Sequence, residues 1–521
     1  MIIVKNLVKK FGDRVIIRDF SYHFPKNTNI GIVGANGAGK TTLLNILTGL
    51  EEYDDGEVII PKDCALGYLP QSPNKNPQET ILDECISGHA TLCKLQQKLH
   101  QALKDISENY SDELYEKYEK IEAEFSDSGG YALEAKAKGV LTGLGFAASQ
   151  FDKSPLILSG GWRMRLELAR LLMNEPNFLI LDEPTNHLDL PSLTWLEGYL
   201  KSFCGTLLFV SHDREFLNNL SDQIIHVANG NVNVYNGNFE DFVEQREMRS
   251  EYAQKQKDAL KKQQNHLQEF VDRFRYKSSK AKQAQSKLKI IERLKQLEER
   301  IDVEETDQQP VFKMTVENQS AKVVLDLKNV AIGYNGITLN KNIDLRIIRG
   351  NKIAIIGSNG IGKSTLLKTI IREIPLISGE MQLGNNVSIG YYAQNQLDVL
   401  DPELDVLENI MTLTKDINQQ QVRAILGCLL ISKNDVKKPI SVLSGGEKSK
   451  VAIAVLLAQK SNFLIFDEPT NHLDMSSTEA LSNALNEYNG TVLVVSHNRS
   501  FINSFATHIF SMDEKKCFYK E

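Results

Sequence analysis

Five sequence motifs occur twice in this chain, in the same order, and this duplication limits the possible folds more than any other feature. A chain of 521 residues is long for a single hydrophobic core, and two copies of one motif set predict two homologous domains. The pairs are GANGAGKTT at Gly34 and GSNGIGKST at Gly357, GYLPQ and GYYAQ, LSGGW and LSGGE, FLILDEPTNHLD and FLIFDEPTNHLD, and LLFVSHD and VLVVSHN.

The two halves differ in length at one place. Lys40 and Lys363 are 323 positions apart, whereas Ser159 and Ser444 are only 285 positions apart, so the first half contains 38 extra residues. The spacing from the first motif to the glutamine of the second is the same in both halves. The extra residues therefore lie between Gln71 and Ser159.

This insertion, at about residues 75–130, is predicted to be a helical hairpin, because apolar residues recur there at spacings of three and four. Ser111, followed by two acidic residues, suits a helix start between the two arms. The hairpin is either a subdomain packed on its own domain or an arm that contacts a partner. Its apolar residues are Leu92, Leu95, Leu99, Leu103, Ile106, Tyr110, Leu114, Tyr118, Ile121 and Phe125.

Residues 239–320 are predicted to be a helical linker between a first domain at 1–238 and a second at 321–521. Charged residues dominate this segment, and its apolar residues repeat every three or four positions, which is typical of an antiparallel coiled-coil pair. One arm carries Leu260, Leu267, Phe270 and Phe274, and the other Leu288, Ile291, Leu294, Leu297 and Ile301.

The tip of this linker, residues 272–289, is basic. It holds seven Lys and Arg residues and one acid, in a chain whose net charge is −7. Such a tip is either a solvated coil end or a contact to nucleic acid phosphates, and charge does not distinguish RNA from DNA. The candidate RNA-contacting residues are Arg273, Arg275, Lys277, Lys280 and Lys282.

Composition excludes several classes of protein. No run of about 18 to 20 apolar residues suits a membrane span and the start has no signal-peptide pattern, so a cytoplasmic location is expected. Six scattered cysteines show neither CxxC spacing nor histidine partners, which argues against zinc and disulfides.

The first motif of each half matches GxxxxGK[ST] between an apolar strand and a helix, the context of a phosphate-binding P-loop in an α/β fold. Its backbone N–H groups surround phosphate oxygens, its lysine neutralises the β- and γ-phosphates, and its hydroxyl ligates Mg²⁺. ATP and Mg²⁺ are the expected ligands. The candidate binding residues are Gly34, Asn36, Gly37, Gly39, Lys40, Thr41 and Thr42, and Gly357, Asn359, Gly360, Gly362, Lys363, Ser364 and Thr365.

Two acidic residues follow an apolar strand in each half. Asp182 and Asp467 are predicted to face the metal, and Glu183 and Glu468 to orient and deprotonate the attacking water. A surface pair of acids would not need an apolar strand directly before it.

These motifs together resemble the ATP-binding cassette (ABC) family, whose diagnostic signature stands here as LSGGW and LSGGE. The resemblance implies two cassettes docked head to tail, each ATP lying between the P-loop of one and the signature of the other. Lys40 would share its nucleotide with Ser444, Gly445 and Gly446, and Lys363 with Ser159, Gly160 and Gly161.

The same resemblance implies further site residues. His212 and His497 match the switch histidines, Gln71 and Gln394 the glutamines near Mg²⁺, and Asp189 and Asp474 the D-loop. Phe11 and Tyr334 stand where an aromatic ring stacks on adenine. Two departures are Trp162 at the fifth signature position and Asn498 where the first half has Asp213, which predicts unequal hydrolysis at the two sites.

Two fused cassettes joined by a charged helical linker are similar to the ABC-F subfamily, over essentially the whole chain. That resemblance implies an ATPase that binds the ribosome near the tRNA exit site when ATP-loaded and leaves on hydrolysis, working as a monomer with intramolecular cassette pairing. Protection of the ribosome from antibiotics is an alternative, although the tip looks short. The ATPase component of a membrane transporter is a further alternative.

Overall fold

The structure is a computed structural model that divides into two compact units. One unit is Met1–Val234 with Gln309–Glu521, which contains both cassettes, and the other is Tyr235–Gln308. The model describes residues 2–69, 79–108, 111–186, 188–274, 281–300, 318–334, 336–393, 399–414, 417–431, 435–471, 473–513 and 518–520. Outside this part lie Gln71, Gln394, Arg275, Lys277, Lys280 and the side chains of Arg273 and Lys282.

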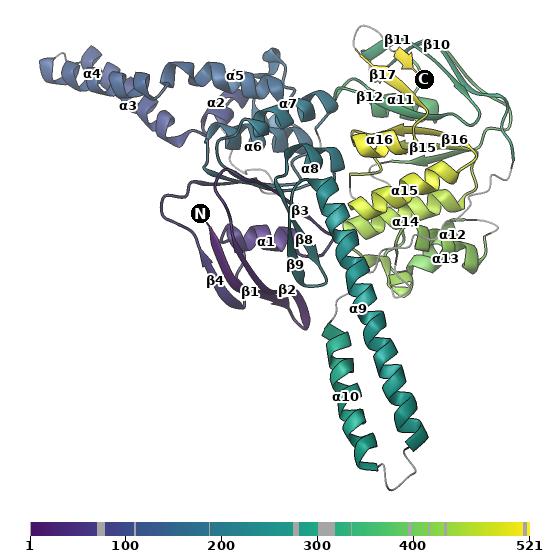
Figure 1. The fold of residues 1–521 in the computed structure, drawn as a ribbon. Coiled ribbons are helices and arrows are strands. Elements are labelled where there is room, and N and C mark those ends of the chain that lie inside the picture. The colour runs from purple at the N-terminus through teal and green to yellow at the C-terminus, as the bar shows by residue number, and fades with distance from the viewer. Residues whose placement is uncertain are drawn as a thin grey trace. The chain divides into compact units, whose positions relative to one another are not determined.

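The first cassette contains two sheets (Figure 1). The smaller is antiparallel, with the order β2-β1-β4, and the larger has the order β5-β6-β7-β3-β8-β9. The strands are β1 Ile3–Phe11, β2 Arg14–His23, β3 Asn29–Val33, β4 Asp55–Ile59, β5 Leu66–Leu69, β6 Phe178–Asp182, β7 Thr206–Val210, β8 Gln223–Ala228 and β9 Asn231–Asn236.

The second cassette repeats this topology. Its smaller sheet has the order β11-β10-β13 and its larger sheet the order β14-β15-β16-β12-β17-β18. The strands are β10 Val323–Tyr334, β11 Ile337–Ile348, β12 Lys352–Gly357, β13 Ser378–Leu383, β14 Ile389–Tyr392, β15 Phe463–Asp467, β16 Thr491–Val495, β17 His508–Met512 and β18 Phe518–Lys520.

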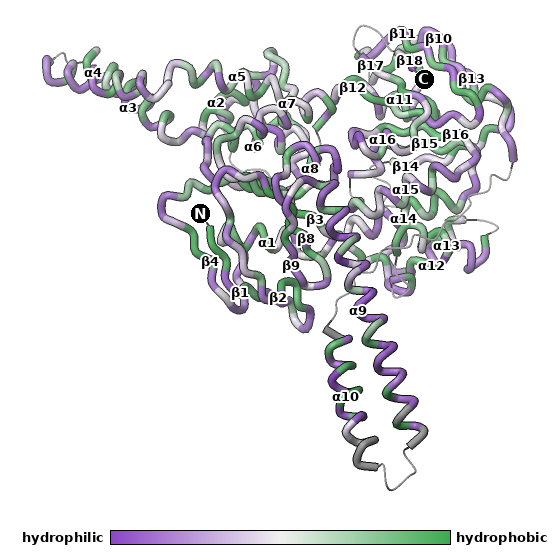
Figure 2. The backbone as a smooth tube through the Cα atoms, in the orientation of Figure 1, coloured by the Kyte–Doolittle hydropathy of each residue, from purple (hydrophilic) through white to green (hydrophobic). Residues whose placement is uncertain are grey.

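The central strands are apolar runs because parallel strands are buried on both faces. Every residue of β6, β7, β15 and β16 is buried, and Figure 2 shows hydrophobic residues gathered in the large sheets. Asp182 pairs with Val210 and Asp467 with Val495, so the acidic residues end their strands level with the neighbouring strands. This register brings the P-loops, acids and histidines together at the carboxyl ends of the parallel strands.

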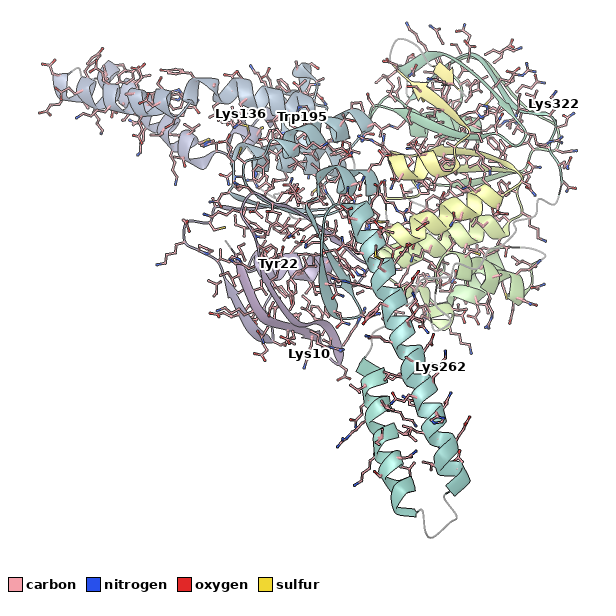
Figure 3. All side chains as sticks on the ribbon, viewed as in Figure 1. Lys10, Tyr22, Lys136, Trp195, Lys262 and Lys322 are labelled. Carbon is pink, nitrogen blue, oxygen red and sulfur yellow. The ribbon has the colours of Figure 1, made fainter. Side chains whose placement is uncertain are left out.

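Helices connect the strands. In the first cassette they are α1 Lys40–Leu47, α2 Ile81–Ile86, α5 Leu133–Gly143, α6 Gly160–Met173, α7 Leu190–Lys201 and α8 Arg214–Leu220. In the second they are α11 Lys363–Ile370, α12 Val406–Leu413, α13 Gln419–Cys428, α14 Gly445–Ala458, α15 Met475–Glu487 and α16 Arg499–Phe505. In the first cassette, α7 carries Trp195, and α5 carries Lys136 (Figure 3).

The predicted hairpin in the first cassette is confirmed. It consists of α3 Ala90–Glu108 and α4 Asp112–Asp127, and the Ser111 side chain caps α4 by accepting the Leu114 N–H. Leu92, Leu95 and Leu99 are buried along α3. The spacing rule therefore identified both helices, but it was wrong for Leu103, which is 45% exposed.

The linker unit contains two long helices, α9 Phe239–Phe274 and α10 Ala281–Arg300, which run antiparallel (Figure 1). Ile291 and Leu294 are buried as the pattern predicts, together with Val271 on α9. The prediction was wrong for Leu288 and Leu297, which are exposed, because the contact between two helices is narrower than the apolar stripe. None of the helices in the described part of the chain is both long and apolar enough to cross a membrane.

Candidate functional site

Both P-loops depend on glycine at positions that other residues do not tolerate. Gly34 has a φ of 154°, and a Cβ there would lie 2.3 Å from the carbonyl oxygen of Val227. Gly39, with a φ of 106°, precedes α1 and would clash with Ile16. The loop can therefore curl tightly enough to direct its N–H groups inward.

The P-loop lysines curl back over their own loops. Lys40 Nζ donates to the carbonyl oxygens of Gly34 at 2.8 Å and Ala35 at 3.1 Å. Lys363 Nζ donates to Gly357 O at 2.8 Å and also to Asn359 Oδ1 at 3.2 Å. Burial lowers the pKa of both lysines, although nearby carboxylates oppose that shift.

A hydroxyl and a carboxylate meet at the start of each P-loop helix. Ser364 Oγ donates to Asp467 Oδ1 at 3.1 Å, and the Thr41 side chain hydrogen-bonds with Asp182. Hydroxyl and carboxylate oxygens are the donors that Mg²⁺ prefers, so this set fits a magnesium ion.

The two glutamates after the strands have an unusual backbone. Glu183 has a φ of 52° and Glu468 a φ of 49°, a left-handed conformation that is uncommon for a long side chain. Such conformations cost free energy and cluster at functional sites. Their N–H groups donate to the carbonyls of Val210 and Val495.

Each glutamate faces a histidine. His212 Nε2 lies 3.1 Å from Glu183 Oε1, and His497 Nε2 lies 3.3 Å from Glu468 Oε1. Burial raises the pKa of Glu183 to about 7 and that of Glu468 as well, while burial lowers the pKa of His212 to about 4. With lowered pKa values, both histidines are neutral at pH 7.

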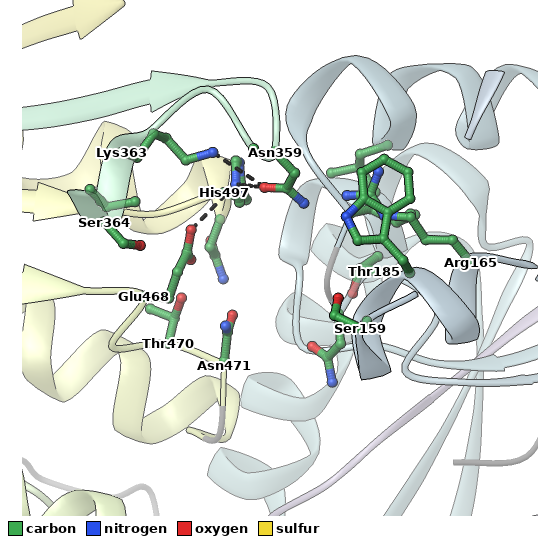
Figure 4. Close-up of a pocket in the computed structure, with 18 of the residues that line it drawn as sticks. Ser159, Arg165, Thr185, Asn359, Lys363, Ser364, Glu468, Thr470, Asn471 and His497 are labelled. Carbon is green, nitrogen blue, oxygen red and sulfur yellow. Dashed lines mark hydrogen bonds and ion pairs between the residues drawn. The ribbon is translucent and has the colours of Figure 1, made fainter. Parts of the chain in front are cut away.

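A cavity of about 540 Å³ is lined by residues of both cassettes (Figure 4). We call it the Lys363 site. The second cassette contributes Tyr334, Asn359, Gly360, Gly362, Lys363, Ser364, Thr365, Glu468 and His497, and the first contributes Ser159, Gly160, Gly161 and Trp162. The P-loop and the opposite signature thus lie around one cavity. Glu468 Oε2 and His497 Nδ1 are buried without a hydrogen-bond partner among the described residues.

A second cavity, of about 450 Å³, is the Lys40 site. The first cassette contributes Phe11, Asn36, Gly37, Gly39, Lys40, Thr41, Thr42, Asp182, Glu183 and His212, and the second contributes Gly446 from its signature. Ser444 is the N-cap residue of α14, and Gly445 is the first residue of that helix. The two sites are therefore reciprocal.

An aspartate from each cassette reaches the opposite P-loop. Asp189 Oδ2 accepts the Asn359 N–H at 2.9 Å, and Asp474 Oδ2 accepts the Asn36 N–H at 3.2 Å. Although burial pushes the pKa of Asp189 upward, hydrogen bonds from Asn359 and Ser192 and the charge of Arg165 hold it below its ordinary value. Each P-loop is thus tied to the other cassette.

Ion pairs also join the cassettes, and they are unequal. Arg499 donates to Glu197 Oε1 at 3.2 Å and to Thr194 Oγ1 at 2.9 Å, and its side chain is only 21% exposed. At the corresponding place Arg214, 40% exposed, donates to Glu479 at 2.6 Å.

The two signatures begin their helices differently. Ser444 and Glu447 form a capping box, in which Ser444 Oγ donates to Glu447 Oε2 at 2.7 Å and accepts the Glu447 N–H. Ser159 makes no capping bond with its side chain. Trp162 instead packs edge-on against Phe146. The fifth signature residue therefore decides whether the serine hydroxyl is engaged.

The aromatic residues expected near adenine both lie at the cavities and are half exposed, 51% for Phe11 and 42% for Tyr334. Thr365 Oγ1 donates to Tyr334 Oη at 2.9 Å. Phe11 has no hydroxyl group and therefore cannot form the equivalent hydrogen bond.

Sequence reasoning missed several residues that line the cavities. Asn186 and Asn471 each line both sites, and Arg14 lines the Lys40 site. The asparagines stand within the duplicated DEPTN segment, so their repetition was a usable signal. Arg14 has no arginine counterpart in the second half, so repetition gave no signal for it.

Comparison with known proteins places this geometry in a family. A family model described as ABC transporter matches residues 17–186 and 340–471, and another of that description matches residues 225–314. The protein YdiF of Bacillus subtilis is 40% identical over 519 residues, covering 98% of this chain and 79% of that protein. ABC transporter F family member 5 of Arabidopsis thaliana is 33% identical over 520 residues, covering 98% and 75%. ATP-binding protein Uup of Haemophilus influenzae is 33% identical over 519 residues, covering 99% and 79%.

Solved structures share the fold. The protein titled RNase-L Inhibitor matches with a TM-score of 0.62 and 19% identity, over 97% of this chain and 87% of that one. A chain in a structure titled "Model of ribosome-bound archaeal Pelota and ABCE1" matches with a TM-score of 0.60 and 18% identity, over 97% and 76%. At these identities the likeness concerns the fold.

Proposed function

The chain belongs to the ABC transporter family, in its subfamily F, and from this premise we propose that it is a ribosome-directed ATPase that binds when ATP-loaded and leaves on hydrolysis. ATP binding and ATPase activity follow from the family and its two cassettes. The proposal adds a site near the tRNA exit position of the ribosome and a cytoplasmic place of action.

The observation that carries the proposed clamp is the pair of reciprocal cavities. The Lys363 site is lined by its P-loop and by Ser159, Gly160 and Gly161 of the opposite signature, and the Lys40 site by its P-loop and by Gly446 of the other signature. ATP bound at both sites therefore stabilises the closed pair of cassettes, and loss of the γ-phosphate removes contacts from both sides at once.

Chemistry within each site is assigned to this chain's own groups. Lys40 and Lys363 bind the phosphates, and Ser159 and Ser444 approach them from the opposite cassette. Glu183 and Glu468, which directly follow the aspartates assigned to the metal, orient the attacking water and accept its proton. His212 and His497 hold these carboxylates in place.

Magnesium is part of the proposal. Thr41 with Asp182, and Ser364 with Asp467, would hold the ion, which when bound neutralises phosphate charge during transfer. The fit rests on the oxygen donors described above.

The ribosome is the proposed partner for two reasons. The basic residues of the linker tip, in a chain that is otherwise acidic, suit RNA phosphates, and cations such as Lys262 extend along α9 as well (Figure 3). The solved structure titled "Model of ribosome-bound archaeal Pelota and ABCE1" has a similar fold and names the ribosome, so the ribosome is the partner to test.

The test is a double substitution, E183Q with E468Q, followed by sedimentation with ribosomes through a sucrose cushion in ATP. Loss of both bases slows hydrolysis by about 10²- to 10⁴-fold, so the variant should stay ribosome-bound. K40A with K363A should not bind, and E57Q, a surface change, should behave like the wild type. Release of the double glutamine variant as fast as the wild type would disprove the clamp.

A further inference from the structure

Arg14 lines the Lys40 site beside its aromatic residue and lies outside the duplicated motifs, whereas the cation Arg165 lines the Lys363 site beside the signature residue Trp162. Arg14 stands three residues after Phe11 and lines the Lys40 site together with Phe11, Asn36 and Gly37. Its Nη2 donates to the carbonyl oxygen of Gly37 at 3.1 Å. The guanidinium is therefore anchored to the P-loop itself.

The second cassette has nothing comparable. Ile337 occupies the corresponding position, three residues after Tyr334, and it is 68% exposed. At this edge the Lys363 site is lined by Tyr334 and Leu339. One site has a cation beside its aromatic residue where the other has apolar side chains.

The anchor leaves most of the Arg14 guanidinium available. A guanidinium has five N–H donors in a planar fork, and the bond to Gly37 uses one of them. Arg14 lies between the aromatic Phe11 and the loop that surrounds the β- and γ-phosphates. In a nucleotide that spans these two points, the α-phosphate occupies the intervening position.

The opposite cassette places a negative charge near the Lys40 site, and Arg14 can compensate for it. The capping box places the carboxylate of Glu447 at the second signature, where the first signature has Trp162. A negative charge at the second signature disfavours the approach of a polyphosphate to the Lys40 site, and the positive charge of Arg14 at that site offsets it.

We propose that Arg14 binds the α-phosphate of the nucleotide at the Lys40 site alone, and that this contact makes the two sites unequal in nucleotide affinity. The proposal rests on the assignment of both cavities as ATP sites and names a further binding residue for one of them. It predicts that the Lys40 site retains a nucleoside diphosphate through a contact that the Lys363 site lacks.

The experiment measures MgADP affinity by calorimetry in full-length protein with one site disabled. In the K363A background, where the Lys40 site remains, R14A should weaken binding about tenfold, the effect of one charge-assisted contact at an exposed position. In the K40A background R14A should change the affinity less than twofold, whereas I337R should tighten it.

Further arms separate the alternatives. R14K in the K363A background should recover part of the lost affinity because it restores the charge. With 2′-deoxy-ADP as the ligand, R14A should still weaken binding about tenfold. If R14A has no effect on the binding of this ligand, Arg14 contacts the ribose and not the phosphate, which would overturn the proposal. If R14A weakens MgADP binding equally in the K363A and K40A backgrounds, Arg14 has a structural role. If R14A does not weaken binding in the K363A background, Arg14 does not contact the nucleotide. If K363A protein binds no MgADP, the nucleotide assignment of the Lys40 site fails and takes this proposal with it, whereas failure of ribosome binding leaves the test intact.

Discussion

The Lys363 site and the Lys40 site share the same loop, acidic pair and histidine but differ in what surrounds them. Ser159 makes no capping bond beside Trp162, whereas Ser444 is held by Glu447. Repetition of the motifs therefore conserves the phosphate-binding geometry of a cassette. The residues around the motifs distinguish one site from the other.

Contacts between the cassettes show the same division. The aspartate bonds to Asn36 and Asn359 occur on both sides, while the ion pairs of Arg499 and Arg214 differ in burial. Partly buried ion pairs with several hydrogen bonds contribute more than exposed single pairs. One side of the interface is therefore held more firmly than the other.

The largest expected effect concerns hydrolysis at the individual sites. Because Ser444 Oγ is engaged by Glu447, it must exchange that partner for a phosphate, so the Lys40 site should hydrolyse more slowly. We expect E468Q to lower steady-state phosphate release about tenfold, a barrier difference of about 1.4 kcal/mol, and E183Q to lower it less than twofold. Equal losses would mean that the signatures do not distinguish the sites.

The next effect concerns closure of the cassettes. R499A should destabilise the closed state by about 1 to 2 kcal/mol because it removes a partly buried cation from Glu197 and Thr194. R214A, which removes an exposed pair, should cost about 0 to 1 kcal/mol. Distances between spin labels on the two cassettes, measured with ATP, report the closed fraction. A larger effect for R214A would reverse the comparison.

The smallest effect concerns the residue beside each histidine. Asp213 and Asn498 cap α8 and α16 alike, Asp213 by accepting the Phe216 N–H and Asn498 by accepting the Phe501 N–H. Burial raises the pKa of Asp213 to about 6, above the value of about 3.9 in an unfolded chain. Its favourable contribution to folding is therefore complete below about pH 4 and is lost as the pH rises through 6.

D213N should keep the N-cap hydrogen bond of α8 and remove the loss of stability that accompanies ionisation of Asp213. Its melting temperature should exceed that of the wild type by about 2 to 4 °C at pH 7, corresponding to about 1 kcal/mol, and the difference should vanish near pH 4. The matched control is N498D, which should show the opposite dependence in the second cassette. A pH-independent difference for D213N would show that ionisation of Asp213 is not its cause.

Much of the fold was predictable because its elements have strong local patterns. The apolar runs before Asp182 and Asp467 predicted buried parallel strands, and the spacing between Leu92 and Phe125 predicted two helices with a start at Ser111. The linker was predicted as a helical pair, yet the exposure of Leu288 and Leu297 was not, since periodicity does not give the width of a contact.

Within the candidate site, motif residues were predictable and their neighbours were not. The loop, acid, signature and histidine positions stand in repeated strings, whereas Arg14 and the partners of Arg499 come from parts of the chain without such strings. A contact between residues about 300 positions apart leaves no mark on local sequence. The left-handed backbone of Glu183 was equally hidden, because glutamate does not favour that conformation.

The sequence by itself determined that this protein has two nucleotide-binding cassettes, a helical insertion in the first and a charged helical pair between them. Periodicity and duplicated phosphate-binding strings encode these features locally. Only the tertiary structure decided that Ser159 lines the cavity of Lys363, that Ser444 is engaged by Glu447 and that Arg14 lines the cavity of Lys40. These features depend on side chains brought together across the interface by folding, and distance along the chain does not specify them.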